Sequence, residues 1–142
     1  MRALYIVSTL FMLLTSSTFA QQPPEIDASE SEGGLYSKSY SDCMAKSEGV
    51  TVNMLDCSTD ELRRQDAALN AAYRKLMASL PPLQQEQLRE AQRAWIRSRD
   101  GSCLLLQSRE GGGTLAAVMG SDCVLEETTR RSKWLDALLD LQ

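Results

Sequence analysis

The stretch that decides the fold is TVNMLDCSTDELRRQDAALNAAYRKLMASL, residues 51–80. Its large apolar side chains recur three, four or seven positions apart, so they share one face of a helix: Leu55, Leu62, Leu69, Tyr73, Leu76 and Leu80. A helix with one apolar stripe must bury that stripe against another element. The sequence therefore predicts a long helix at the centre of a helical domain.

Proline and glycine mark where this helix and its neighbours end. Thr51 is a suitable N-cap, and Pro81-Pro82 stops the helix after about Ser79. A start near Thr59 is the alternative, because the preceding Ser58 fits a capping box with Glu61. Similar signals predict three more helices. A short helix, Tyr40–Ser47, ends at a left-handed Gly49. A long helix begins at Pro82 or Leu83 and ends at Gly111-Gly112-Gly113, and the last helix, Leu115–Leu141, is capped by Thr114.

No segment alternates with period two as a strand would, so we expect an all-α fold. It should be a small helical bundle of three long helices plus a short N-terminal helix. Short connections predict antiparallel neighbours, that is, a helical hairpin extended by a third long helix and closed by the short one. The core should include Leu88, Ala91, Trp95, Cys103 and Leu106 of the third helix and Val118, Leu125, Leu135, Leu138 and part of Trp134 of the fourth.

The N-terminal segment has the features of an export signal. Arg2 precedes an apolar run from Leu4 to Leu14, and Thr18-Phe19-Ala20 is a small-residue cleavage site, so residues 1–20 are predicted to be a signal peptide. Residues 21–37, which are rich in Pro, Ser, Glu and Gly, should form a disordered leader. Residues 38–142 should form one domain, located in the periplasm or outside the cell after cleavage near Ala20.

The four cysteines, Cys43, Cys57, Cys103 and Cys123, all follow the predicted cleavage site. An even number of cysteines in an exported chain favours disulfides. The sequence has no His, which excludes a mixed Cys/His zinc site, and we expect no metal. Equal distances from the helix turns favour Cys43–Cys57 and Cys103–Cys123, although the same argument also places Cys57 near Cys103.

The charge of the chain disfavours nucleic acid as a partner. Removal of Arg2 with the signal leaves 14 basic against 19 acidic side chains, a mature net charge of 14 minus 19, or about −5. An acidic exported protein attracts cationic partners at long range. No Cys follows the cleavage site to take a lipid, so no membrane anchor is expected, and the sequence does not determine the oligomeric state.

Nothing in the composition favours an enzyme. The absence of His removes the usual general base and the Ser/His and Cys/His nucleophile pairs. The triple glycine lacks the Lys-Ser/Thr of a phosphate-binding loop, and we expect no cofactor. A glycosidase would need paired carboxylates, for which the candidates on the 51–79 helix are Asp56, Asp60, Glu61 and Asp66. Charges on a long helix are more often a solvated face, so we expect no catalytic residue.

The most distinctive stretch is QRAWIRSRDGSC, residues 92–103, in which Trp95, Arg99 and Cys103 share a helix face. Arg99 should be partly buried, and its guanidinium then needs acceptors. We expect a structural polar lock between the second and third helices, formed by Asp66, Asn70, Tyr73, Trp95 and Arg99. The alternative is an exposed Arg/Trp recognition patch, whose candidate partner-contacting residues are Arg93, Arg97 and Asp100.

The motifs QRxWxxxRDxxC and LNxxYxxL together resemble the LprI-type lysozyme-inhibitor family of small exported helical domains with four cysteines. The similarity covers Tyr40 to Leu139 of domain 38–142 and is carried by Cys43, Thr51 to Cys57 with Glu61, Leu69-Asn70-Ala71-Ala72-Tyr73-Arg74-Lys75-Leu76, Gln92-Arg93-Ala94-Trp95, Arg99-Asp100-Gly101-Ser102-Cys103, and Cys123 with Thr128, Arg131 and Leu135. The resemblance implies an α-helical envelope protein and, for the name-giving member, inhibition of lysozyme. One departure is Gln21, because a lipid-anchored version would begin its mature chain with Cys.

The leading hypothesis is therefore a diffusible, non-enzymatic binding protein whose partner is a cationic lysozyme-like muramidase. Inhibition would occur by steric occlusion of the sugar-binding cleft, with acidic surface groups assisting the encounter. The alternative is an immunity or regulatory protein for another envelope-acting partner. A third hypothesis is a cell-wall glycosidase that uses paired carboxylates.

Overall fold

The computed structural model describes residues 34–109 and 111–141, which contain four helices and no strand. The helices are α1 (Lys38–Lys46), α2 (Thr51–Ser79), α3 (Pro82–Arg109) and α4 (Gly113–Leu139). The expected all-α bundle of three long helices and one short helix is confirmed. The predicted signal peptide, and the predicted leader as far as residue 33, lie outside the described residues.

The helix boundaries follow the proline and glycine signals more closely than the cap signals. α3 begins at Pro82, and Gly49 adopts a left-handed φ of 76° after α1. The start near Thr59 is wrong, because α2 already begins at Thr51. Neither predicted threonine cap is correct, since the N-caps are Val50 and Gly112, without a side-chain hydrogen bond. α2 begins one residue and α4 two residues earlier than the threonine caps predicted.

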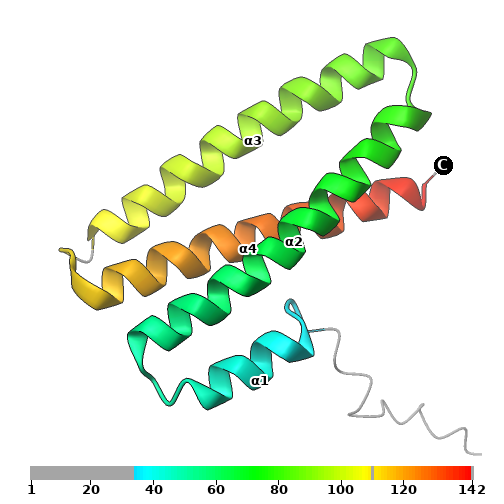
Figure 1. Cartoon of the computed structure of the whole chain (residues 1–142). Helices are drawn as coiled ribbons and strands as arrows, with labels where there is room; N and C mark the ends of the chain where they lie inside the picture. The colour runs from blue at the N-terminus through cyan, green and yellow to red at the C-terminus, as the bar shows by residue number, and fades with distance from the viewer. Residues whose placement is uncertain (1–33, 110, 142) are drawn as a thin grey trace, which may run out of the picture. The chain divides into compact units, whose positions relative to one another are not determined.

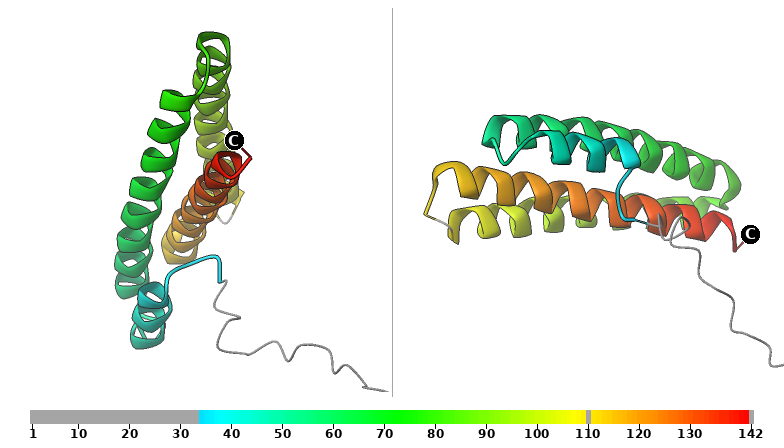
Figure 2. Two further views of the ribbon diagram at one scale, coloured as in Figure 1. Left: turned by 90° about the vertical axis from the view of Figure 1, so that its right-hand side faces the viewer. Right: turned by 90° about the horizontal axis from the view of Figure 1, so that it is seen from below.

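α4 lies between α2 and α3. Figures 1 and 2 show α2 and α3 diverging from their shared turn, while α4 runs back between them. The most extensive helix pair is α2 with α4, followed by α3 with α4, and α1 packs on α2. α2 and α3 are therefore joined by a short turn as predicted, but α2 packs mainly against α4 and not against α3.

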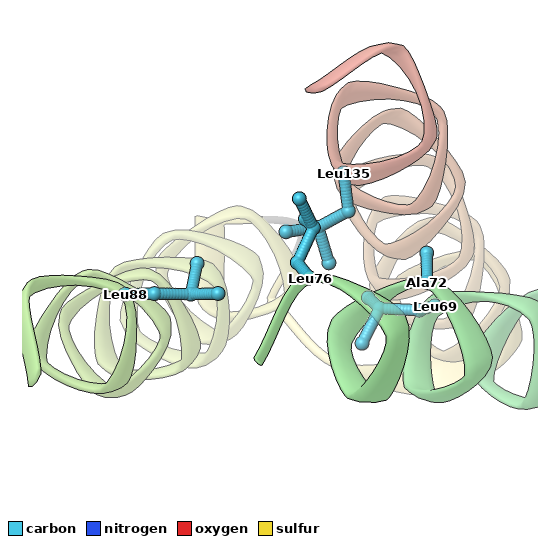
Figure 3. Close-up of a cluster of buried hydrophobic side chains, with 5 residues drawn as sticks. All are labelled: Leu69, Ala72, Leu76, Leu88 and Leu135. Carbon is cyan, nitrogen blue, oxygen red and sulfur yellow. The ribbon is translucent and has the colours of Figure 1, made fainter. Parts of the chain in front are cut away.

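The main apolar cluster joins the three long helices. It consists of Leu69, Ala72 and Leu76 from α2, Leu88 from α3 and Leu135 from α4. Figure 3 shows Leu76 and Leu135 directed toward one another, with Leu88 reaching in from α3. Leu76 and Leu135 are buried almost completely, so this cluster fixes how α4 sits against α2.

One residue expected in the core is instead exposed. Ala91 of α3 faces solvent, whereas Trp134 is 45% exposed and thus partly buried, as expected. With α4 as its principal neighbour, α3 buries a narrower face than its apolar pattern predicted.

A second apolar cluster lies where α1 meets α2 and α4. Its buried members are Tyr40, Cys57 and Leu125, and Tyr36 and Cys43 pack against them. The expected disulfides Cys43–Cys57 and Cys103–Cys123 are both present, so the alternative pairing of Cys57 with Cys103 is wrong. Closing loops of 14 and 20 residues stabilises such a domain by about 3 kcal/mol each on the chain-entropy model.

Candidate functional site

The candidate functional site is a cleft of about 320 Å³ between α2 and α3. It lies where these two helices diverge from the Pro81-Pro82 turn. Only residues of α2 and α3 line it, so α4 does not fill this space. The α2 wall is formed by Asp66, Leu69, Asn70 and Tyr73, and the α3 wall by Arg89, Gln92, Arg93, Trp95, Ile96 and Arg99. The five residues of the predicted polar lock all lie at this cleft.

The hydrogen bonds of Arg99 differ from the expected ones. Its Nη1 donates to Thr128 Oγ1 of α4 at 3.2 Å, and its Nε donates to Asp100 Oδ1 at 2.9 Å. The guanidinium carbon also lies 5.0 Å from the centre of the Trp95 ring. Arg99 therefore ties α3 to α4 and not to α2, because α4 is the helix that packs against this part of α3.

The expected acceptors on α2 bond to each other. Asn70 Nδ2 donates to the Asp66 backbone oxygen and to Asp66 Oδ2, both at 2.9 Å. Tyr73 packs against the main apolar cluster. These three side chains form the opposite wall of the cleft and face the arginines across it without locking the two helices together.

Arg131 of α4, one of the residues that carry the family resemblance, contacts Gln92 and Trp95 of the α3 wall without itself lining the cleft. Its Nε donates to Gln92 Oε1 at 2.9 Å, and its guanidinium carbon lies 4.2 Å from the Trp134 ring centre and 5.6 Å from that of Trp95. Its Nη2 is buried without a hydrogen-bond partner among the described residues. Burial lowers the pKa of this guanidinium. The family pattern had included Arg131 but had not indicated which residues it contacts.

The three residues expected to contact a partner are all exposed on α3. Arg93 lines the cleft and forms an ion pair with Glu90 at 2.7 Å. Arg97 is exposed and does not line the cleft. Asp100 is exposed and is the partner of Arg99. The cleft thus brings Arg93 together with the lock residues and leaves Arg97 and Asp100 outside it.

A separate polar cluster surrounds Glu61, whose side chain is fully buried. Its two carboxylate oxygens accept hydrogen bonds from Ser37 N at 2.9 Å, Ser37 Oγ at 2.6 Å, Arg64 Nε at 2.8 Å and Gln65 Nε2 at 2.7 Å. Burial alone would raise the pKa of Glu61, but these hydrogen bonds outweigh it and lower the pKa to about 2. Glu61 therefore stays ionised and fastens the chain before α1 to α2.

Ser37 also caps α1, since its Oγ accepts a hydrogen bond from Tyr40 N at 3.1 Å. The residues just before it are held as well, because Tyr36 packs in the second apolar cluster. The predicted disordered leader therefore extends too far at its C-terminal end. Residues 34–37 belong to the folded domain because Glu61 and Tyr40 supply contacts that their own composition does not show.

Three of the four carboxylates considered for a glycosidase, Asp60, Glu61 and Asp66, have structural partners. Glu61 has a pKa of about 2 and cannot hold a proton for a leaving group near neutral pH. Asp60 pairs with Arg63 at 2.7 Å, and Asp66 accepts from Asn70. Within residues 34–109 and 111–141 no group of three or more Cys, Asp or Glu could hold a metal ion. The arrangement is better suited to binding than to acid–base chemistry.

Among the helices of the described residues, none has the combination of length and apolarity that crossing a bilayer requires.

The fold and the cleft define an all-helical, two-disulfide domain with an arginine- and aromatic-lined cleft beside its core. A family model described as "Lysozyme inhibitor LprI" matches residues 28–135. The chain therefore belongs to the LprI lysozyme-inhibitor family.

A relative of similar length is the "Uncharacterized protein R02472" of Rhizobium meliloti (strain 1021). It is 28% identical over 153 residues, which cover 99% of this chain and 97% of the relative. No solved structure matches the chain.

Proposed function

We propose that this protein is a non-enzymatic binding protein of the cell envelope that inhibits a lysozyme-type muramidase. The observation that carries the proposal is the match of residues 28–135 to the lysozyme-inhibitor family. In this proposal the domain acts after signal cleavage, as a diffusible protein in the periplasm or outside the cell. Inhibition requires no chemistry of its own, because the domain covers the sugar-binding cleft of the enzyme.

The rigidity of the domain supports this mode of action. Two disulfides and three long helices packed on one cluster give a surface that loses little conformational freedom on binding. The acidic charge assists encounter with a cationic enzyme. Raising the salt concentration should therefore slow association more than it speeds dissociation.

The contact surface in this proposal is the exposed face of α3. Arg97 and Asp100 lie on it, with Arg93 at its edge. Ile96 is 40% exposed on the same helix and supplies apolar area. Arginine beside exposed apolar side chains is a combination enriched at the centres of protein interfaces.

The test is a titration of the oxidised mature protein against muramidase activity on cell-wall suspensions. We expect activity to fall to a low plateau at equimolar protein. Unchanged rates, with a known tight inhibitor working in the same assay, would reject the proposal. In that case, co-purification of a different envelope protein from periplasmic extract would favour the immunity or regulatory alternative.

A matched pair of variants tests the contact surface. Arg97→Ala should weaken inhibition by about tenfold, as expected for a contact arginine at an interface. Arg74→Ala removes the same side chain from an exposed position on α2 and should leave inhibition unchanged. Equal inhibition by both variants would place the contact elsewhere on the domain.

A further inference from the structure

The α3 wall of the cleft carries hydrogen-bond donors that the fold does not use. Arg93 pairs with Glu90 through Nη1, which leaves its Nε and Nη2 without partners among the described residues. Arg89 bonds Glu86 through Nε and Nη2, which leaves Nη1. Gln92 accepts from Arg131 through Oε1, so its Nε2 amide stays available as a donor.

The α2 wall offers mostly acceptors. Asn70 uses Nδ2 on Asp66 and keeps its Oδ1 available, and Asp66 keeps its second carboxylate oxygen. Tyr73 adds a hydroxyl that has no hydrogen-bond partner among the described residues. A ligand that fits both walls must present an acceptor group toward α3 and N–H or O–H donors toward α2.

The charge of the cleft differs from that of the whole protein. Three guanidinium groups, from Arg89, Arg93 and Arg99, line it against one carboxylate, Asp66, although the chain as a whole carries a net charge of −4. The pairs of Arg89 and Arg93 with glutamates are exposed i,i+3 pairs, which are weak and can exchange partners. Guanidinium groups that can exchange partners recognise carboxylates well, since their donor geometry matches two oxygens.

The size and the apolar part of the cleft restrict the ligand further. A volume of about 320 Å³ lies at the lower end of small-molecule sites. Leu69, Trp95 and Ile96 supply apolar surface between the polar groups. This space fits a unit of the size of one sugar ring or one dipeptide.

We propose that the cleft between α2 and α3 binds a small carboxylate-bearing ligand that also carries N–H or O–H donors. An acidic N-acylated sugar and a short peptide with a free C-terminal carboxylate share this chemistry. The carboxylate lies against Arg89 and Arg93, and the donors reach Asp66 and Asn70. This site shares Arg93 and Ile96 with the muramidase contact proposed for α3, but ligand binding is measured without a muramidase and does not depend on that activity.

The experiment is a calorimetric titration of the mature protein with two pairs of probes. N-acetylmuramic acid is compared with N-acetylglucosamine, which lacks the carboxylate-bearing side group, and N-acetyl-alanyl-alanine with N-acetyl-alanyl-alaninamide. In at least one pair the acid should bind about tenfold more tightly than its neutral counterpart, because a charge-assisted hydrogen bond is worth about that factor. Preference in the first pair identifies a sugar source, and preference in the second a peptide source.

Two variants locate the binding. Arg93→Gln should weaken binding of the preferred acid by about tenfold. Arg74→Gln makes the same change of charge at an exposed α2 position outside the cleft and should bind like the wild type. Far-UV circular dichroism establishes that both variants are folded.

The side-chain amide signals of Gln92 and Asn70 in nuclear magnetic resonance spectra should also shift during the titration. If neither acid binds better than its neutral counterpart, or if the two variants bind equally, the proposed site is overturned. Because no muramidase is present, neither result bears on inhibition.

Discussion

The polar cluster around Glu61 and the polar cluster in the cleft differ in how completely their hydrogen-bonding groups find partners within the chain. Glu61 is fully buried, and its carboxylate accepts four hydrogen bonds. In the cleft, Arg93 and Gln92 keep unused donors. Arg131, which donates to Gln92 from α4 without lining the cleft, has a buried Nη2 without a partner among the described residues. A charge whose hydrogen-bonding capacity is filled within the chain serves the fold, whereas unfilled capacity at an open cleft is available to a ligand.

Removing the Glu61 carboxylate should give the largest effect. Glu61→Ala leaves the donors of Ser37, Arg64 and Gln65 without their acceptor and should lower the free energy of unfolding by about 4 kcal/mol. Urea denaturation of the oxidised protein measures this. Asp60→Ala, which breaks an exposed pair on the same helix, is the control and should cost less than about 1 kcal/mol. Similar losses in the two variants would contradict the structural role of Glu61.

Acid should weaken the Glu61 cluster in a defined pH range. The pKa of Glu61 is about 2 in the folded protein against an ordinary value of 4.5, so the folded state favours the ionised form. The stabilisation is complete above pH 4.5 and is lost as the pH falls toward 2, by about 3 kcal/mol in total.

The matched variant for the pH experiment is Glu61→Gln, which cannot titrate at this position. Unfolding free energies of both proteins are compared at several pH values from neutral to 2. The wild type should lose about 3 kcal/mol more than the variant over the acid range, since the other carboxyl groups titrate in both. Parallel pH curves would show that Glu61 is not the group responsible.

Replacing Arg131 should have the smallest effect. Arg131→Met keeps an unbranched stem and removes a half-buried cation that has an unfilled N–H, and such replacements are often neutral. The free energy of unfolding should change by less than about 1 kcal/mol, and tryptophan fluorescence should report the altered contacts with Trp95 and Trp134. If Arg131→Met lowered the free energy of unfolding as much as Glu61→Ala, the proposed difference between the two clusters would be wrong.

Helix positions and disulfide pairs were predictable because they depend on local signals. Pro81-Pro82 ended α2 and started α3 as expected, since proline cannot continue a helix. Equal distances to helix turns favoured Cys43–Cys57 and Cys103–Cys123, the pairs that are present, although the same argument allowed Cys57 with Cys103. The sequence also placed the lock residues near one another, although it assigned the wrong acceptors to Arg99.

What the sequence determined by itself is therefore the set of helices, the approximate apolar stripe of each and a preference for the cysteine pairs that form. Only the tertiary structure decided which helix covers which face, because periodicity identifies an apolar stripe but not its neighbour. The position of α4 between α2 and α3 gave Arg99 its partner Thr128 and left the cleft open. In the same way, the sequence predicted that Glu61 is a solvated charge on a helix. The fold instead places Ser37, 24 residues earlier in the chain, against its carboxylate.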